Sequence, residues 1–417
     1  MTHLDWHANR SDNPWLPLPE ITPGSSDIDL PRVRKYRLER VRGEMARQGV
    51  DALILSDPVN IRYTTGTRNM QVFSARNAPA RYLLVTPEKT ILFEFTGCNH
   101  LADGFETVDE VRPALTASFV AAGPRIASLE RSWAEQVYHT LVPLVGSRPV
   151  IGMERINAGA ALALAALEVR LEDAQSVLEM ARAIKSPEEV KCVIASLRST
   201  ESAVEKLRTA LRPGITENQL WSVLLQSIIA DDGDYCETRL PGSGPRTNPW
   251  FQEAGNRGLR AHEPVGLDTH VVGSPGHYAH FSRTFHPGPH RPRPPHRHLY
   301  PVPHDQRHPN TRILQHGPAC PEHAEPDWEI PQRYFENRYY LSAHGCGMTG
   351  EYPYLYHRAD FSDAGYEGVL QPGMVICVES YIGEVNGREG VKLEEQVLIT
   401  NDGVERLSRF PFEPSLL

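Results

Sequence analysis

The chain has 417 residues, of which 40% are hydrophobic and 23% are charged. This balance is typical of an ordinary soluble globular protein, and at about 150 residues per domain the length predicts two or three domains. The formal net charge of −9 argues against a general nucleic-acid binder and against a protein that binds anionic membranes, because both depend on a basic surface.

Neither membrane insertion nor secretion is expected. The longest apolar run, residues 158–167, falls short of the roughly 18 residues that span a bilayer. The first residues show no basic-then-apolar signal pattern. The six cysteines include no C-x-x-C pair, so they favour neither a disulfide framework nor a zinc knuckle. We therefore expect a cytoplasmic protein.

The first part of the chain predicts a small α/β domain. Residues 1–30 are rich in Pro, Asp, Asn and Ser, which predicts an arm that wraps a partner or is loosely ordered. A helix is expected from Pro31 to about Arg47, with Gly49 as its C-cap. Three short apolar segments then predict strands: Ala52–Leu55, Tyr82–Val85 and Thr90–Phe95. The alternation predicts an α/β domain over residues 31–180.

A second domain is expected over residues 181–417. Ser186 is a good N-cap, and Glu189 completes a capping box at the start of a helix. A second capping box at Thr216 predicts another helix to about Ala230. The apolar pattern then changes to strands: Val265–Val272, Val375–Glu379 and Val391–Ile399. Two helices that lead into a strand-rich region predict an α+β domain.

Residues 286–326 fit neither pattern. These 41 positions hold 11 of the 35 prolines and 8 of the 18 histidines. Proline at this density forbids a regular helix, although hydrophobic residues between the prolines keep a helix-like spacing. The local signals conflict, so we make no structural prediction for this segment.

Polar residues of the second half could carry chemistry. Asp268 and His270 are two residues apart, which would place them on one face of a strand. His280 lies ten residues further on, a spacing that a hairpin could fold back beside them. His344 stands next to a glycine in the string His344–Met348, and glycine lets the backbone approach a site closely.

Two carboxylates complete this set. Glu379 ends an apolar strand, and Glu394 points away from the face that Val391 and Leu393 share. Carboxylates at the ends of apolar strands are costly unless a cation neutralises them, and carboxylate with imidazole suits Fe, Zn, Mn or Co. Taken singly, each could be a surface or ion-paired residue. Together they predict a metal site with these ligands: Asp268, His270, His280, His344, Glu379 and Glu394.

In this order, these residues resemble the pita-bread metallopeptidase superfamily, which includes methionine and Xaa-Pro aminopeptidases, prolidase and creatinase. That superfamily holds two metals with an Asp, a second Asp about ten residues later, a His and two Glu. The helix start Lys185–Glu189 and the string Leu370–Met374 are further marks. The string Tyr63–Gly66 resembles the creatinase-type N-terminal domain. The resemblance covers nearly the whole chain after residue 30. It implies an α+β protein with a creatinase-like first domain and a pita-bread second domain.

Within this superfamily, the strings Asn337–Thr349 and Gly373–Gly383, together with the extra acid Asp268, resemble the metallopeptidase-like dimethylsulfoniopropionate lyases. Xaa-Pro peptidases usually carry a second His at the position of Met348 and a Pro at that of Ser380. The resemblance implies cleavage of this zwitterionic small molecule to dimethyl sulfide and acrylate. It also implies a homodimer and one or two metal ions, iron first, with Zn, Mn or Co as alternatives.

Two other functions stay open at this point. One is an Xaa-Pro dipeptidase or aminopeptidase-type hydrolase, against which the Met348 and Ser380 departures weigh. The other is a non-catalytic, metal-poor relative on the same fold, which His270 and His280 favour.

The lyase pattern has Asp at three positions, but His270 and His280 occupy two of them in this chain. A carboxylate can bridge two metals with its two oxygens, whereas a neutral imidazole offers one nitrogen. The site should therefore hold one metal better than two. A single G-to-C codon change converts Asp to His, so an alternative hypothesis is that both positions are misread aspartates in a segment rich in His and Pro. Peptide masses decide between the two.

The general base and the substrate contacts are also predicted from the resemblance. The lyases are thought to use an Asp shortly after the His-Gly-x-Gly-Met string. Here Gly350 occupies that position, and we predict that the neighbouring Glu351 is the base, although a shift of one residue on a strand turns a side chain to the other face. Tyr339 and Tyr340 are candidates for substrate contact, and packing is at least as plausible a role for both.

Overall fold

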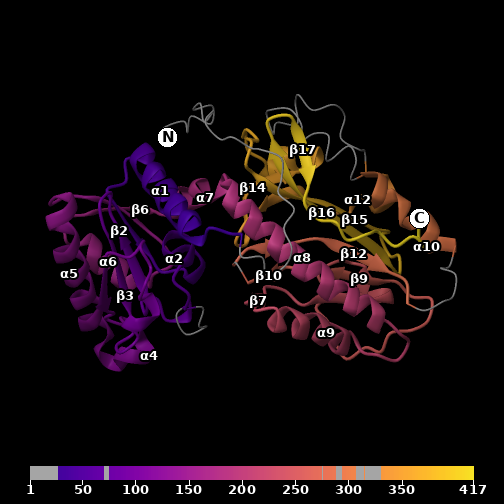
Figure 1. The fold of residues 1–417 in the computed structure, drawn as a ribbon, viewed down its shortest axis with the longest axis horizontal. Coiled ribbons are helices and arrows are strands. Elements are labelled where there is room, and N and C mark those ends of the chain that lie inside the picture. The colour runs from indigo at the N-terminus through magenta and orange to yellow at the C-terminus, as the bar shows by residue number, and fades with distance from the viewer. Residues whose placement is uncertain (1–26, 70–74, 275, 288–293, 307–313, 315–329) are drawn as a thin grey trace. The chain divides into compact units, whose positions relative to one another are not determined.

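The computed structural model describes residues 27–69, 75–274, 276–287, 294–306, 314 and 330–417 (Figure 1). These residues form two compact units. The first is Asp29–Arg182, and the second is Ala183–Leu417 with the described residues before Asp29. Most of the expected arm, residues 1–26, lies outside the described residues. In the part of the chain that the structure describes, no helix is both long enough and apolar enough to cross a membrane.

The first unit is built on a six-stranded mixed sheet in the order β4-β3-β2-β1-β5-β6. Its strands are β1 (Ala52–Leu55), β2 (Tyr82–Val85), β3 (Thr90–Glu94), β4 (Glu110–Pro113), β5 (Val150–Met153) and β6 (Arg170–Asp173). Its helices are α1 (Leu30–Gln48), α2 (Pro58–Thr65), η1 (Asn99–Ala102), α4 (Phe119–Ala122), η2 (Gly123–Arg125), α5 (Ile126–Val145), α6 (Ala158–Ala165) and α7 (Gln175–Ala183). Trp133 of α5 is fully buried against the sheet, which makes this the core of an α/β unit.

The local signals of the first unit are confirmed. Helix α1 starts one residue before Pro31, and the Asp29 side chain accepts a hydrogen bond from the Arg32 amide at 3.0 Å. Gly49 follows the helix with a φ of 69°, the left-handed conformation that glycine adopts without strain. The three predicted strands are β1, β2 and β3.

The second unit has two long helices and three sheets. Its helices are α8 (Pro187–Ala210), α9 (Glu217–Ala230), η3 (Gly244–Thr247), α10 (Pro294–Leu299), α12 (Gln332–Phe335) and α13 (Arg358–Ala364). Its strands are β7 (Tyr235–Cys236), β8 (Leu240–Ser243), β9 (Val265–Asp268), β10 (Val271–Val272), β11 (Tyr278–Ala279), β12 (Ser282–Phe285), β13 (Leu341–Cys346), β14 (Gly350–Tyr356), β15 (Val375–Gly383), β16 (Gly390–Thr400) and β17 (Gly403–Arg406). The sheet orders are β11-β10-β7, β12-β9-β8 and β14-β13-β15-β16-β17.

Helices α8 and α9 both begin at the predicted capping boxes. Ser186 and Thr216 each accept a hydrogen bond from the third helical amide, and the side-chain oxygens of Glu189 and Gln219 each accept one from the cap amide. Figure 1 shows both helices against the strands of this unit. Their apolar residues share one core with β9 to β12 and with part of β15, so the helices support the strands that carry the predicted ligands.

One strand prediction is wrong. The segment Val265–Val272 is not continuous, because β9 ends at Asp268 and β10 begins at Val271. Between them, His270 has a φ of 40°, which is uncommon for a residue other than glycine. The reason is tertiary: β9 pairs with β8 and β12, whereas β10 pairs with β7 and β11.

The proline- and histidine-rich segment is described only in part. Residues 288–293, 307–313 and 315–329 lie outside the described residues. Two short helical stretches occur between them, α10 and residues 301–306. Helix at this proline density is therefore limited to about one or two turns in each stretch.

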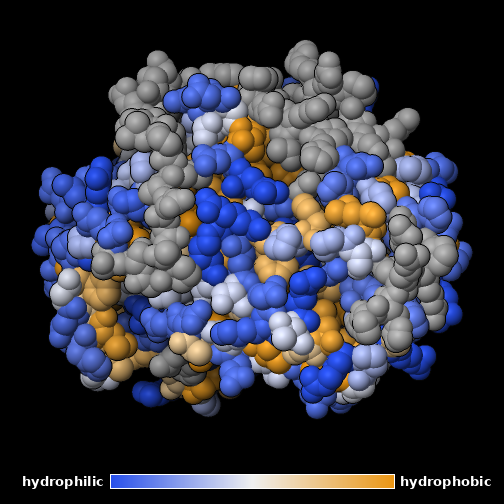
Figure 2. Space-filling model, turned by 45° about the vertical axis from the view of Figure 1, so that its right-hand side comes forward, coloured by the Kyte–Doolittle hydropathy of each residue, from blue (hydrophilic) through white to orange (hydrophobic). Residues whose placement is uncertain are grey.

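The surface has the mixed character of ordinary folded domains. On the face drawn in Figure 2, hydrophilic residues dominate the coloured area and hydrophobic residues show in separate areas. Individual exposed apolar side chains such as Phe119 and Val120 are normal on folded proteins.

Candidate metal centre and active site

A hairpin brings two of the predicted ligands, Asp268 and His280, together. Strand β9 pairs with β12, with Asp268 opposite Ser282, and β10 pairs with β11, with Val271 opposite Ala279. His280 lies between these two pairings, so its ring faces the end of β9. Its Nε2 is 3.1 Å from Asp268 Oδ1. The hairpin that the spacing predicts therefore forms.

His270 also lies beside Asp268, but its backbone geometry differs from the predicted one. It does not share a strand face with Asp268, because its left-handed backbone breaks the strand. Its Nδ1 is nevertheless 3.5 Å from Asp268 Oδ1, and its ring centre is 4.1 Å from that of His280. The Thr238 hydroxyl, 2.6 Å from His270 Nδ1, fixes the ring. Strained backbone at such a position is typical of functional sites.

The two glutamates face each other across neighbouring strands. Glu379 of β15 pairs directly with Glu394 of β16, and like charges in this position repel. Lys392 lies two residues before Glu394 and so on the same face. Its Nζ forms an ion pair with Glu379 Oε2 and lies 2.6 Å from Glu394 Oε1. Sequence reasoning missed Lys392, although the alternation of strand side chains already placed it beside Glu394.

His344 completes the group from β13. Its Nδ1 donates a hydrogen bond to the Gly345 carbonyl at 2.8 Å, which leaves the lone pair of the neutral ring on Nε2. That Nε2 lies 2.9 Å from Glu379 Oε1. At this distance a proton or a metal cation can be shared between the ring nitrogen and the carboxylate oxygen. A Cβ on Gly345 would overlap the Tyr352 backbone, so the glycine lets β13 and β14 approach closely.

The donor set fits a divalent transition metal. His280 Nε2 and Asp268 Oδ1 are buried and form no hydrogen bond with any described residue. His280 Nε2 is also 3.0 Å from Glu394 Oε2. Three groups of donors have ligand atoms within 4.8 Å of one another: His280, His344 and Cys377; Asp268, His270 and His280; His280, Glu379 and Glu394. His280 is common to all three. Buried imidazole and carboxylate groups are ligands that Fe, Zn, Mn and Co accept.

Burial and neighbouring charges set the protonation of the centre. Burial lowers the pKa of His270 to about 4, so its imidazole is neutral, the form that binds metals. Burial alone would lower the pKa of Lys392, but Glu379 and Glu394 hold it well above the usual lysine value. Burial alone would lower the pKa of His280, but Cys377, Glu394 and Asp268 hold it well above the usual value, so a metal that binds there displaces a proton. Burial alone would raise the pKa of Glu394, but Lys392 and the protonated His280 hold it well below the usual value. Lys392 is therefore an ammonium beside the ionised carboxylate of Glu394.

Glu351, the predicted base, has a partner that the sequence does not indicate. It lies on β14, and its carboxylate is buried and ion-paired with Lys185. It also packs on Gly347, where a Cβ would overlap its oxygens. Lys185 is the first residue of the helix start Lys185–Glu189 noted in the sequence. Because 166 residues separate it from Glu351, the sequence alone does not indicate the pair. The role of Glu351 as base stays a prediction.

Tyr339, the other predicted catalytic residue, lies at the edge of the centre. Lys392 Nζ is 3.8 Å from the centre of its ring, a separation at which cation and aromatic face attract. Burial, followed by the negative charge of Glu379, raises the pKa of its phenol far above the usual range, so the hydroxyl stays protonated. Tyr340 is 45% exposed.

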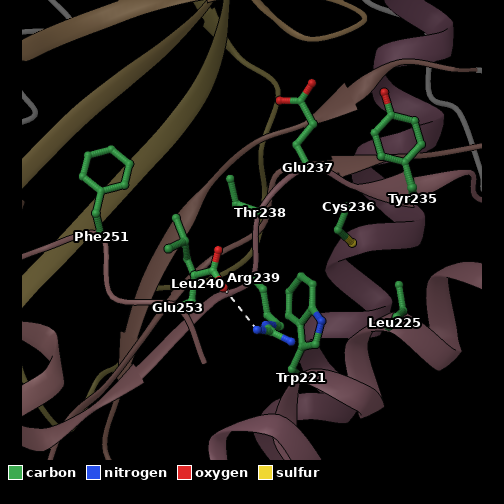
Figure 3. Close-up of a pocket in the computed structure, with 10 residues that line it drawn as sticks. All are labelled: Trp221, Leu225, Tyr235, Cys236, Glu237, Thr238, Arg239, Leu240, Phe251 and Glu253. Carbon is green, nitrogen blue, oxygen red and sulfur yellow. Dashed lines mark hydrogen bonds and ion pairs between the residues drawn. The ribbon is translucent and has the colours of Figure 1, made fainter. Parts of the chain in front are cut away.

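A pocket of about 550 Å³ borders the centre, and sequence reasoning did not find it (Figure 3). Thr238 lines this pocket and contacts His270 directly. Phe251 lines it as well, and its ring centre is 5.6 Å from that of Tyr339. Its remaining lining residues come from α9 and from the segment around β7 and β8: Trp221, Leu225, Tyr235, Cys236, Glu237, Arg239, Leu240 and Glu253. None of the six predicted ligands is among these lining residues, and the Thr238 contact with His270 connects the pocket to the centre.

Two family models match the chain. The creatinase/prolidase N-terminal domain matches residues 37–184, and metallopeptidase family M24 matches residues 191–401. Together they span both compact units. The fold class expected from the resemblance, a creatinase-like domain followed by a pita-bread domain, is confirmed.

Curated relatives and solved structures agree with these matches. The dimethylsulfoniopropionate lyase DddP of Roseobacter denitrificans is 30% identical over 100% of this chain and 91% of its own length. The lyase of the same name from Roseovarius nubinhibens is 31% identical over 95% of this chain and 90% of its own length. The Xaa-Pro dipeptidase from Bacillus anthracis has the same fold, with a TM-score of 0.71 and 19% identity over 91% of this chain and 99% of that one. The chain therefore belongs to metallopeptidase family M24, as a DddP-like member of the pita-bread proteins.

Proposed function

We propose that this protein is a metal-dependent lyase that cleaves the carbon–sulfur bond of dimethylsulfoniopropionate to dimethyl sulfide and acrylate. The observation that carries the proposal is the similarity to two lyases of that name at 30% and 31% identity over nearly the whole chain. Met348 and Ser380 also support it, because Xaa-Pro peptidases usually carry a His and a Pro at these two positions.

The metal would be held by the cluster around His280. We propose a divalent transition metal there, iron first, with zinc, manganese and cobalt as alternatives. When bound, such an ion supplies a Lewis acid for the carboxylate end of the substrate.

The residues of the chain supply the rest of the elimination. A base removes a proton from the carbon next to the substrate carboxylate. The electron pair of that bond forms the C=C bond of acrylate while the C–S bond breaks, and dimethyl sulfide leaves as a neutral molecule. Glu351 is the proposed base. The aromatic rings of Trp221, Tyr235 and Phe251 on the pocket wall offer faces that attract the sulfonium cation.

An Xaa-Pro dipeptidase is the second candidate. It is favoured by the shared fold with an Xaa-Pro dipeptidase, but at 19% identity that likeness speaks for the fold and not for the reaction. A non-catalytic relative is the third candidate, because two imidazoles stand where the lyase pattern has carboxylates.

One experiment separates the three candidates. The purified protein is analysed for bound metal and is then given dimethylsulfoniopropionate or a Gly-Pro dipeptide in parallel. The lyase releases dimethyl sulfide into the headspace and leaves the dipeptide intact. Dipeptide cleavage without dimethyl sulfide would overturn the proposal in favour of the hydrolase, and no turnover with little metal would favour the non-catalytic relative.

We also propose, from the resemblance alone, that the protein is a cytoplasmic homodimer. Light scattering on the purified chain tests the dimer, and cell fractionation tests the location.

A further inference from the structure

Glu394 lies between two different positive or metal-attracting groups. Its Oε2 is 3.0 Å from His280 Nε2, and its Oε1 is 2.6 Å from Lys392 Nζ. The two oxygens of one carboxylate therefore contact two different groups, the imidazole of His280 and the ammonium of Lys392. The donors around His280 also include Asp268 and His270.

The carboxylates around Lys392 already have a cation. Lys392 pairs with both Glu379 and Glu394, and its side chain is 1% exposed. The rings of Tyr339 and Trp250 lie 3.8 and 5.6 Å from its Nζ. Two carboxylates and two aromatic faces thus hold the ammonium in place, so it is a fixed part of the centre and not a mobile surface lysine.

The charges of the centre balance with one divalent ion. Three carboxylates, those of Asp268, Glu379 and Glu394, stand against the single ammonium of Lys392, which leaves two negative charges. The imidazoles add none when neutral. One divalent ion cancels the remainder, whereas two would leave an excess of two positive charges in a buried site, which is costly.

The donor atoms also indicate that the centre binds one metal ion. Two metals side by side need ligands that reach both, and a neutral imidazole offers one lone pair. His280 Nε2 faces Asp268 and Glu394 at 3.1 and 3.0 Å, so it can serve one ion only.

We propose that the centre holds one divalent metal ion per chain, bound by Asp268, His270, His280 and Glu394, and that the ammonium of Lys392 occupies the place of a second metal between Glu379 and Glu394. The inference rests on the metal site of the proposed function and adds the number of ions, their ligands and the role of Lys392.

The test is a metal count that does not depend on activity. The full chain is produced from a gene that encodes the printed sequence, and its intact mass verifies His at positions 270 and 280. It is stripped of metal, titrated with Co²⁺ and examined by native mass spectrometry and by the visible absorption of bound cobalt. We expect saturation at one ion per chain. Saturation at two ions, or no binding, overturns the inference.

Variants of Lys392 test whether its ammonium takes the place of a second metal ion. Lys392→Gln removes the charge, so we expect a second and weaker Co²⁺ to bind near Glu379. Lys392→Arg is the matched control, because it keeps the charge and should stay at one ion. A single ion in both variants would overturn the role of Lys392. The deciding count on the unaltered chain remains valid even if a variant does not fold.

A triple variant tests the imidazoles together with Lys392. His270→Asp and His280→Asp add two negative charges and bridging oxygens, and Lys392→Gln empties the place of the second ion, so the count should rise from one ion to two. A count that stays at one would overturn the inference.

The same samples separate this inference from the proposed function. One ion per chain without release of dimethyl sulfide keeps the inference and overturns the lyase function. Two ions per chain with release of dimethyl sulfide overturns the inference and keeps the lyase function.

Discussion

The two units of this protein each bury a cluster of charges, and the clusters differ in how they are completed. In the first unit, Arg81 and Glu94 are both fully buried and joined at 2.6 Å. Asn69 donates to the other oxygen of Glu94 at 3.1 Å, and Arg81 donates to Thr67 at 2.8 Å. One carboxylate meets one guanidinium there, so the two charges balance, and both carboxylate oxygens accept hydrogen bonds. Arg81 Nη1 has no hydrogen-bond partner among the described residues. In the second unit, the described residues around His280 have more carboxylates than cations.

The difference shows how to distinguish a structural ion pair from a functional site. A buried charge cluster that the chain balances by itself stabilises one conformation and needs no further partner. A cluster with excess negative charge is complete only when a cation binds. The Asp268–His280 contact belongs to the second kind, although each distance in it resembles an ordinary ion pair.

The largest expected effect comes from breaking the incomplete cluster. Asp268→Ala removes one of its three carboxylates and a proposed ligand, so we expect metal affinity to fall by about a hundredfold or more and dimethyl sulfide release to be lost with it. Metal analysis after dialysis and the headspace assay measure both effects. Asp402→Ala, in the exposed turn after β16, is the matched control and should retain both. Full metal content in Asp268→Ala would refute the ligand assignment.

Breaking the balanced cluster should act on stability alone. Arg81→Met leaves Glu94 buried without its cation, and we expect a loss of about 3–5 kcal/mol in the free energy of unfolding of the first unit. Urea unfolding of the full chain measures it. The double variant Arg81→Met with Glu94→Leu should recover much of the loss, because no buried charge remains. A change in metal content per folded chain would contradict the separation of the two clusters.

The buried ion pair of Glu351 and Lys185 is intermediate between these two clusters, because it could serve stability, catalysis or both. Glu351→Gln keeps the shape but removes the charge opposite Lys185, so we expect a loss of about 1–3 kcal/mol in stability. If Glu351 is also the base, dimethyl sulfide release falls by about a hundredfold or more at unchanged metal content. Thermal unfolding and the headspace assay separate the two effects. Turnover within a factor of two of the unaltered chain would leave the ion pair as the whole role of Glu351.

Several parts of the fold could be predicted because their signals are local. The capping boxes at Ser186 and Thr216 are satisfied by backbone groups three residues away, so a short stretch of sequence contains both partners. Gly49 marks the end of α1 for the same reason. The spacing of Asp268 and His280 was also sufficient, because a hairpin of that length has few ways to close.

Other parts depend on partners far along the chain. The strand around His270 breaks because β9 and β10 pair with different strands, and the residue pattern alone reads as one continuous strand. Lys185 meets Glu351 only because α8 begins near β14. The pocket beside Thr238 arises where α9, β7 and β8 come together, and no segment of the sequence contains it.

By itself, the sequence determined which side chains could bind a metal, because residue type and strand alternation fix the kind of donor and the face it occupies. Only the tertiary structure decided that Lys392 stands among them as a cation and that Glu351 is held by Lys185. The physical reason is that charge balance in a buried site is a property of all the groups within a few ångströms. That set is assembled by strand pairing and not by order along the chain.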